Sequence, residues 1–362
     1  MLLIIDLSLL EKDIISQPKI LDKMAPKIWR ETEKVVEHIS KAKSIILTGC
    51  GDSLFSSIAG KYMLESIACV PSIAENSYEF TNYSYIPKDS LLVAISASGR
   101  TRTTVEAVRK AEQLGIETIA ITCNPNGEIL KYSKHSIVID VRDSVPVPTI
   151  TSIMFLWTLA AFSILIGHRE GNLDEKKFEE LKAELFGIDN KLKNIEIPDS
   201  QLELVSRFIR KKGLVKPCIY LIGGGPNFST ALFGMAKLRE LNIAHSIAFE
   251  LEEFLHYGNI PLTENELSII IACGKSVERG NDAFKLLQLL NAGIITISTT
   301  KIGGSEYIAV PNIEEVFSPI LCLHAIQRIA ADMAHRIYGE QLEIRHGEAI
   351  SRIIRICSAE DN

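Results

Sequence analysis

Two short stretches rich in small and hydroxyl residues are the parts of this sequence best suited to bind an anion. They are residues 49–53 (GCGDS) and residues 96–101 (SASGRT), which we call together the anion cradle. Each follows an apolar run typical of a buried strand and precedes a helical pattern. First-turn N–H groups have no intrahelical partner and the helix dipole is positive there, so a phosphate could collect backbone and hydroxyl donors. The alternative is an ordinary strand–helix turn in which Ser and Thr serve only as caps.

The elements around the cradle alternate between strands and helices. A strand is expected at Leu91 to Ile95, before a helix from Thr101 to about Leu114. Further strands are expected at Ser44 to Thr48, Cys69 to Ala74, Glu117 to Thr122 and Ser136 to Val141. This alternation predicts an α/β fold with a doubly wound parallel sheet, covered by helices on both faces. Both cradle loops then lie at carboxyl ends of strands, where open parallel sheets bind ligands.

The same pattern recurs in the second half of the chain. Strands are expected at Cys218 to Ile222, His245 to Phe249, Leu267 to Ala272 and Ile294 to Ser298, with helices from about Phe228 and near Asn281 to Asn291. Gly49 and Gly223 are 174 positions apart, and Gly115 and Gly293 are 178 apart. Two copies of one α/β unit explain this spacing. The second copy has Cys273-Gly274-Lys275-Ser276 in place of SASGRT, so we expect one phosphate site per chain, in the first copy.

The expected organisation has five parts. Residues 1–40 form a helical segment, which Pro18 and Pro26 are expected to break, and residues 41–168 form the first α/β domain with the cradle. Residues 169–200 form a charged helical connector, 201–340 the second domain and 341–362 a C-terminal tail. The very apolar helix expected at Ile153 to Gly167 is too short to span a bilayer comfortably, and we expect it to be buried between domains or subunits.

Composition narrows the class of protein further. The 362 residues are 46% hydrophobic and carry a net charge of −6 with no block of Lys or Arg, which argues against nucleic acid or a membrane surface as the main partner. Seven cysteines occur singly without a Cys-x-x-Cys, as expected for reduced thiols in the cytoplasm. The N-terminus lacks the basic region of a signal peptide. We therefore expect a cytoplasmic protein.

The motifs favour neither a dinucleotide site nor a metal site. Gly49-x-Gly51 follows an expected strand and Glu75 closes the next one, as in a dinucleotide fingerprint, but the third glycine is absent. The histidines outside the motifs described below have no ligand-like spacing. The sequence therefore predicts no nicotinamide, no other cofactor and no metal.

The sequence TGCGDS, followed some forty residues later by AISASGRT, resembles the sugar isomerase (SIS) domain family. The tandem arrangement is similar to the isomerase half of glucosamine-6-phosphate synthase and related sugar-phosphate deaminases, isomerases and deglycases. The resemblance covers nearly the whole chain and begins at residues 12–21 (KDIISQPKIL). It implies two flavodoxin-like SIS domains and a substrate that is a sugar phosphate.

The resemblance also implies roles for residues of the first copy. The phosphate ligands would be four hydroxyls, helped by backbone amides near Asp52 and Ala97: Ser53, Ser96, Ser98 and Thr101. Val147 and Thr149 fall where the family closes the sugar pocket. Arg100 stands where relatives often carry an acidic residue, so phosphate affinity or substrate shape is expected to differ.

In the second copy, residues 234–240 (GMAKLRE) resemble the family's catalytic helix, with Lys237 and the catalytic acid Glu240. Residues three apart share a helix face, so both side chains can reach one pocket, where a carboxylate beside an ammonium could shuttle a proton between C1 and C2 of an open-chain sugar. The alternative is a surface ion pair. Glu253 and His256 match the family's Glu-x-x-His, which implies ring opening by a His from the neighbouring subunit of a homodimer. Residues 257–261 (YGNIP) depart from the Gly-Pro that relatives usually carry directly after this His, so the loop is altered here.

Two further departures from the synthase limit what the resemblance implies. No counterpart of its glutaminase half or nucleophilic Cys is seen, since residue 2 is Leu, so we expect no ammonia from glutamine within these residues. The synthase's tail lysine falls near Ile350, and Arg345, His346 or Arg352 could point into the pocket instead.

The most consistent interpretation is an isomerase or deaminase of a hexose phosphate or amino-sugar phosphate, of the glucosamine 6-phosphate and fructose 6-phosphate type. Two alternatives stay open. One is an aminotransferase subunit that lacks its glutaminase. The other is a non-catalytic sugar-phosphate regulator, since fold does not fix function.

Overall fold

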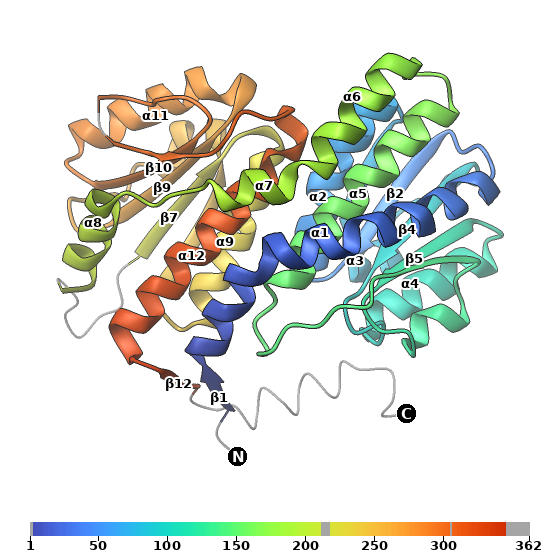
Figure 1. Ribbon diagram of the computed structural model, residues 1–362, viewed down its shortest axis with the longest axis horizontal. Helices are drawn as coiled ribbons and strands as arrows, with labels where there is room; N and C mark the ends of the chain where they lie inside the picture. Colours follow the sequence, from blue (N-terminus) through green and yellow to red (C-terminus); the bar gives the residue numbers. More distant parts are fainter. Residues whose placement is uncertain (1–2, 211–217, 305, 345–362) are drawn as a thin grey trace.

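The protein is built on two five-stranded parallel sheets that lie side by side (Figure 1). The computed structural model describes residues 3–210, 218–304 and 306–344. The first sheet has the strand order β3-β2-β4-β5-β6 and the second β11-β10-β9-β7-β8. The strands of the first sheet are β2 (Ser44–Gly49), β3 (Ser72–Asn76), β4 (Ser90–Ile95), β5 (Glu117–Thr122) and β6 (His135–Val138). The strands of the second sheet are β7 (Cys218–Gly223), β8 (His245–Glu250), β9 (Leu267–Ala272), β10 (Gly293–Ser298) and β11 (Ile308–Ala309).

The two sheets share one connectivity. In each, the first strand along the chain lies between the second and the third, and all pairs are parallel. The order of the strands therefore reverses between β2 and β4 in the first sheet and between β7 and β9 in the second. This shared order agrees with the internal repeat predicted from the glycine spacing.

Alternation along β4 shows how the first sheet is buried. Leu91, Val93 and Ile95 pack in the large core that also contains helix α5 (Ile150–Arg169) and α2 (Asp52–Met63), whereas Leu92 and Ala94 pack with α4 (Arg102–Gln113) and α3 (Ser77–Asn82). Strand side chains alternate between the two faces of a sheet, and helices cover both faces here, so both sets are buried. The strand predicted to start at Cys69 starts at Ser72 instead, since Cys69 has a left-handed φ of 53° after the π-turn Leu64–Ala68.

Helix α1 (Leu7–His38) runs without interruption through Pro18 and Pro26, so the predicted break is wrong (Figure 1). An interior proline removes one hydrogen bond and costs about 3 kcal/mol in an isolated helix. Here a buried stripe at seven-residue spacing holds the helix against the core: Ile14, Leu21, Ile28 and Val35. The burial of this stripe, which lies against α5 and α12 (Ser318–Tyr338), outweighs the lost bonds.

The second half repeats the layers with other helices. Helix α9 (Phe228–Glu240) packs against β7, β8 and the first-half helix α2, and α11 (Val277–Leu289) covers the other face. The predicted connector, residues 169–200, forms α6 (Glu175–Phe186) and α7 (Ile188–Lys193), and α8 (Asp199–Arg210) begins at its end and belongs mostly to the second half. Short turns complete this half: η3 (Gly225–Asn227), α10 (Leu251–Glu253), η4 (Phe254–Gly258), η5 (Gly274–Ser276) and η6 (Glu315–Phe317); η2 (Glu128–Lys131) belongs to the first half.

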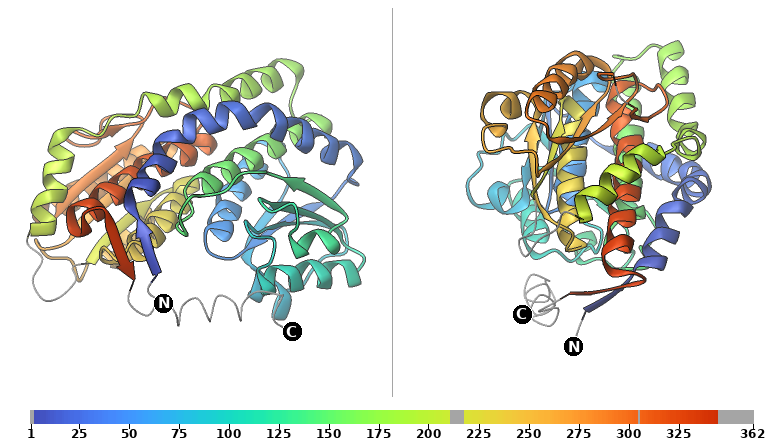
Figure 2. Two further views of the ribbon diagram at one scale, coloured as in Figure 1. Left: turned by 60° about the horizontal axis from the view of Figure 1, so that its bottom comes forward. Right: turned by 90° about the vertical axis from the view of Figure 1, so that its left-hand side faces the viewer.

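Two features were not foreseen in this form. Strands β1 (Leu3–Asp6) and β12 (Gln341–Ile344) pair antiparallel and bring the two ends of the described chain together (Figure 2). Helix α5 has 20 residues, five more than predicted, and is the one helix in the described ranges long and apolar enough to cross a membrane. Its most apolar window is entirely buried inside the protein, between α1, α2 and α6.

Candidate active site

The two loops of the anion cradle lie next to each other at the carboxyl ends of β2 and β4, where the strand order reverses. A Cβ at Gly49 would lie 3.0 Å from the carbonyl oxygen of Ile95, so no larger residue fits between the loops. Open parallel sheets bind ligands at this position. The sheet topology therefore brings Ser53 close to Ser96 and Thr101.

The second cradle loop is held by its own hydroxyls. Ser96 Oγ lies 3.1 Å from Thr101 Oγ1 and accepts a hydrogen bond from the N–H of Gly99, and Ser98 Oγ accepts one from the N–H of Arg100. Gly99 has a φ of 66°, and a Cβ there would lie 2.6 Å from Cα of Gly127. Glycine is thus required both by the backbone conformation and by the close approach.

Neither helix that starts at the cradle is capped by a side chain. Gly51, with a φ of 57°, is the N-cap of α2, and Thr101 is the N-cap of α4, whose hydroxyl lies against Ser96 rather than over the first turn. A Ser or Thr that served only as a cap would accept a bond from its own helix. The arrangement instead leaves two helix N-termini facing one loop pair, which favours an anion site over simple capping.

A buried ammonium joins the cradle to the second half of the chain. Lys237 on α9 is 1% exposed, and its Nζ lies 2.9 Å from Oδ2 of Asp52 and 2.6 Å from Oε2 of Glu240. Asp52 directly precedes Ser53 on α2, and its Oδ2 also accepts a hydrogen bond of 2.7 Å from Ser152 Oγ on α5. Lys237 and Glu240 therefore form a triad with Asp52 around a fully buried ammonium, and not a surface ion pair, although the Glu240 side chain itself is 36% exposed. The Asp52 carboxylate faces Lys237, so only its backbone N–H is left for the predicted phosphate site.

The charges around this triad set its protonation. Burial alone would lower the pKa of Lys237, but the carboxylates of Asp52 and Glu240 outweigh burial and raise it, so the amine stays an ammonium. Burial is also the largest influence on Glu240. Together with the charges of Asp52 and Asp143 it outweighs the attraction of Lys237 and raises the pKa of Glu240 to about 7. A carboxyl that titrates near neutrality suits proton transfer in either direction.

Asp143 is a residue that the sequence analysis missed, and it organises the loop before α5. Its Oδ1 accepts bonds from the N–H groups of Thr149 (2.9 Å) and Ile150 (2.6 Å), and its Oδ2 accepts one from Thr151 Oγ1 (2.6 Å). Val147 and Thr149, predicted for the sugar pocket, are each 1% exposed and lie with Lys237 around a small internal space. Asp143 thus caps the N-terminus of α5. The sequence feature that could have predicted this is an Asp a few residues before a helix that begins with threonines.

A cavity of about 510 Å³ opens between the cradle and this loop. Its wall includes Ala97, Ser98 and Arg100 from the cradle and Asp143 and Thr151 from the loop. Asp52, Lys237 and Glu240 do not line this cavity, but Asp143, which does, is near enough for its charge to contribute to the raised pKa of Glu240. The size of the cavity suits a ligand of the dimensions of a sugar phosphate.

His256 and Glu253 are not brought to this cavity within one chain. Glu240 ends α9 just before the start of β8, whereas both residues follow the end of β8, so the length of that strand separates them from Glu240. The His256 side chain is 70% exposed and lies 3.3 Å from Glu252, and Glu253 is exposed beside Tyr257. A role for these residues at Glu240 needs a second copy of the chain. Arg345, His346, Ile350 and Arg352 of the tail lie outside the described residues.

The corresponding loop of the second copy is filled by the protein itself. The N–H of Lys275 donates to Oε1 of Glu315 at 3.1 Å, and a Cβ at Gly274 would lie 2.5 Å from Cδ of the same residue. Ser276 Oγ is bonded to the backbone of Cys273. An internal carboxylate thus lies where an anion would bind, which favours the expectation of a single phosphate site per chain.

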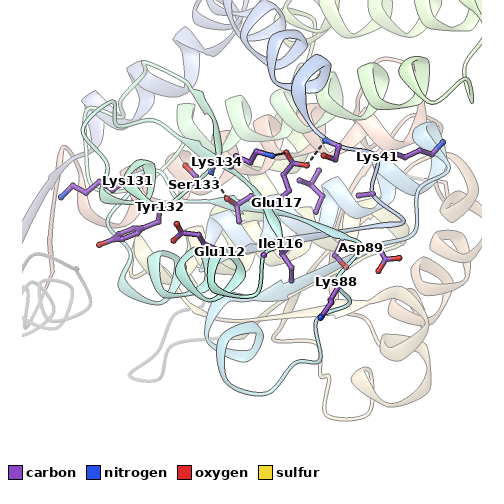
Figure 3. Close-up of a pocket in the computed structure, with 16 residues that line it drawn as sticks. Lys41, Lys88, Asp89, Glu112, Ile116, Glu117, Lys131, Tyr132, Ser133 and Lys134 are labelled. Carbon is purple, nitrogen blue, oxygen red and sulfur yellow. Dashed lines mark hydrogen bonds and ion pairs between the residues drawn. The ribbon is translucent and has the colours of Figure 1, made fainter.

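Another cavity, of about 580 Å³, lies at the opposite end of the first sheet (Figure 3). Its central carboxylate, Glu117, accepts bonds from Lys134 Nζ (2.7 Å), His135 Nε2 (2.9 Å) and the N–H of Ser40 (2.8 Å). Burial would raise the pKa of Glu117, but these bonds outweigh burial and lower the pKa to about 2. The cavity lies at the amino ends of the strands and its carboxylate is fully engaged, so we assign it a structural role.

Glu117→Gln is expected to lower the free energy of unfolding by about 2 kcal/mol at neutral pH. This is less than the full shift in pKa implies, because Lys134 is exposed and solvent screens its charge. The lowered pKa means that the stabilisation is complete above the ordinary pKa of 4.5 and is lost as pH falls toward about 2. Urea unfolding at several pH values should show the gap between wild type and variant closing over that range. Glu112→Gln, on the same cavity wall, is the matched control and should change little. A gap independent of pH would contradict this account.

In the described part of the chain, no group of three or more His, Cys, Asp or Glu side chains could hold a metal ion. The absence of a cofactor stays a prediction.

Comparisons with known proteins agree with the family resemblance predicted from the sequence. Residues 38–163 match the SIS domain family model. The glutamine–fructose-6-phosphate aminotransferase [isomerizing] of Clostridium tetani is 26% identical over 337 residues, 87% of this chain and 54% of its own length. The chain thus spans about half the length of the curated relatives it matches.

Solved structures show the fold. The C-terminal domain of glucosamine-fructose-6-phosphate aminotransferase from Francisella tularensis superimposes with a TM-score of 0.77 at 19% identity, covering 91% of this chain and 96% of that one. Glucosamine-6-phosphate deaminase from Thermotoga maritima gives a TM-score of 0.66 at 19% identity, covering 90% and 94%.

Proposed function

Since this chain carries a SIS domain, we propose that it is an enzyme that moves a proton between C1 and C2 of a hexose phosphate or amino-sugar phosphate. The observation that carries the proposal is the triad of Asp52, Lys237 and Glu240, because it joins the helix that bears Ser53 to the helix that bears the candidate base. The proposal includes two doubly wound SIS domains and a cytoplasmic location; the cysteines of the described residues, all free thiols, support the latter.

In the proposed mechanism the phosphate binds in the cradle, to the hydroxyls of Ser53, Ser96, Ser98 and Thr101 and the first-turn amides of α2 and α4. The phosphate does not react, so its binding energy positions the carbon atoms that do. The sugar then extends along the cavity beside Asp143 toward Glu240. The relatives named above, a fructose-6-phosphate aminotransferase and a glucosamine-6-phosphate deaminase, support this class of substrate.

Glu240 acts as the base. Its carboxylate removes the proton from C2 of the open-chain aldose, and the electron pair forms the C1–C2 double bond of an enediolate with the negative charge on O1. The proton of the C2 hydroxyl then passes to O1, the same carboxyl returns its proton to C1, and C2 becomes the ketone carbon. Lys237 stays protonated beside Glu240 and stabilises the negative charge on oxygen. For an amino sugar, proton transfer in the same direction gives the imine whose hydrolysis releases ammonia.

Ring opening is assigned to His256 of a second copy of the chain, in a homodimer with shared active sites. Its exposure and its separation from Glu240 in one chain support this part of the proposal, because an exposed imidazole is free to enter a neighbour's site. Glu253 would contact the sugar from the same loop.

The test is a panel of glucose 6-phosphate, glucosamine 6-phosphate, and fructose 6-phosphate with ammonia or with glutamine, followed by product analysis and by exchange of the C1 and C2 hydrogens in D₂O. We expect exchange and product formation with at least one of the first two sugars. Product from fructose 6-phosphate with glutamine and a separate glutaminase would favour the aminotransferase alternative. Binding without exchange for every sugar would favour a regulator and overturn the enzyme assignment.

A further inference from the structure

A third cavity, of about 580 Å³, lies away from the candidate active site, between α1, α7, α8 and α12. In Figure 1, α8 lies beside the second sheet, whereas α7 lies between the two halves and α1 runs from near α12 across to the half with the first sheet. One part of the cavity wall is apolar and is formed by Ile14, Ile15, Pro18, Leu192, Ile197 and Leu202. The other part is polar and is formed by Glu11, Lys193, His324, Arg328, Asp332 and His335.

Two of the four charged side chains on this wall are paired with an opposite charge. Lys193 lies 2.9 Å from Asp189, and Asp332 accepts two hydrogen bonds from Arg336, at 2.6 and 2.9 Å. Arg328 differs from these because its one recorded bond is to the carbonyl of Ile195, and no carboxylate lies within ion-pair distance of it in the described residues. Burial lowers the pKa of Arg328, and the exposed Glu196 opposes this only from farther away. The wall therefore holds one half-buried cation, Arg328, that touches no carboxylate of the described residues; the other charge without an ionic partner there is the carboxylate of Glu11, 3.5 Å from the His335 imidazole.

Two imidazoles add hydrogen-bond acceptors to the wall. His324 is 4% exposed, and its Nδ1 lies 2.7 Å from Oε1 of Gln17, an acceptor, so Nδ1 carries the proton and Nε2 is left as an acceptor. His335 is held in the same way, with Nδ1 at 3.1 Å from the carbonyl of Gly339. Its Nε2 is buried without a hydrogen-bond partner, 3.5 Å from Glu11. A buried polar atom left without a partner is costly unless a ligand or water satisfies it.

A line of hydrogen bonds leads from this cavity to the loop of the candidate active site. His324 donates to Gln17, Gln17 Nε2 donates to Oε1 of Gln327 at 2.6 Å, and Gln327 Nε2 donates to the carbonyl of Thr149 at 3.2 Å. Thr149 in turn donates to Asp143. These bonds connect the His324 imidazole to the backbone of Thr149 without a gap.

We propose that this cavity binds a small hydroxylated organic anion with an apolar body, which pairs with Arg328 and donates a hydroxyl to His324 or His335. The anion pairs with the Arg328 guanidinium, which no carboxylate of the described residues contacts, the hydroxyl supplies a donor to an imidazole nitrogen, and the apolar body covers the six aliphatic side chains. Through Gln17 and Gln327 the ligand alters the loop that holds Thr149. This last step alone rests on the proposed function; the binding site does not.

Calorimetric titration with three probes tests the site on the full chain. The probe 4-hydroxybenzoate has the anion, the hydroxyl and the apolar body, whereas benzoate lacks the hydroxyl and phenol lacks the carboxylate. We expect 4-hydroxybenzoate to bind best, and Arg328→Gln to weaken its binding by about tenfold to a hundredfold. Arg328→Lys should keep much of the affinity, which guards against a folding defect in the Gln variant.

Arg207→Gln is the matched control, since it removes one charge from the neighbouring α8 at a side chain that is 61% exposed and outside the cavity. It should leave binding unchanged. Affinity that is equal for the three probes, or the same in Arg328→Gln as in the wild type, would overturn the site, as would a lack of binding by 4-hydroxybenzoate. Binding that fructose 6-phosphate abolishes by direct competition would assign the probe to the cradle instead and would also overturn it. None of these outcomes bears on turnover, so failure here leaves the proposed enzyme standing.

Discussion

Glu240→Gln is expected to abolish turnover while leaving the affinity for the sugar phosphate nearly unchanged. Gln keeps the shape and can still accept the 2.6 Å bond from Lys237, but it cannot take up a proton at C2. General-base catalysis contributes on the order of 10²- to 10⁴-fold, so kcat should fall by about that factor. Binding of the phosphate depends on the cradle, which this substitution does not touch. The measurement is kcat by product formation together with Kd by calorimetry.

The pH dependence of kcat/KM tests the role of Glu240 independently. The pKa of about 7 means that Glu240 is largely protonated below neutrality, so kcat/KM should fall as pH drops through about 7. Glu203→Gln, 67% exposed on α8, is the matched control and should leave rate and profile unchanged. Turnover in Glu240→Gln at the wild-type rate would remove Glu240 from the mechanism.

Lys237→Met should have the largest effect on stability of any single change considered. The ammonium is 1% exposed and faces two carboxylates, at 2.9 and 2.6 Å. Its removal leaves Asp52 with a buried, uncompensated charge and raises the pKa of Glu240, which loses its main attraction. Breaking a buried ion pair costs about 3–5 kcal/mol, and urea unfolding should show a loss of that size.

A second variant separates the charge effect from the loss of packing. In the double variant Asp52→Asn/Lys237→Met the stranded charge is gone, so about 1–3 kcal/mol of the loss should be recovered. Lys176→Met, at an 86% exposed side chain on α6, controls for the change of residue type and should be neutral. Additive effects of the two substitutions would show that Lys237 and Asp52 do not interact.

The sequence predicts the parts of the site that depend on local order. The cradle loops each lie between a strand and a helix that are adjacent in the chain, so composition and periodicity suffice to find them. Lys237 and Glu240 share a helix face because they are three positions apart. The repeat of the glycines likewise points to two sheets of one connectivity.

The parts that the sequence could not predict depend on contacts between distant segments. Asp52 and Lys237 are 185 positions apart, and Gln17 and Gln327 are separated by 310. No periodic pattern links such pairs. The unbroken α1 was missed for a related reason: local propensity predicts a break at each proline, whereas packing against α5 and α12 decides the outcome. Asp143 was overlooked because its partners follow it by six to eight positions in an irregular loop.

The most direct test of the central claim is a crystal structure of the full chain with fructose 6-phosphate bound. The account predicts the phosphate between residues 49–53 and 96–101, in contact with Ser53, Ser96 and Thr101. It also predicts C1 and C2 of the sugar at roughly 3–3.5 Å from the Glu240 carboxylate. A phosphate bound at another place, or a sugar whose C1 and C2 are beyond the reach of Glu240 from every copy in the assembly, would contradict it.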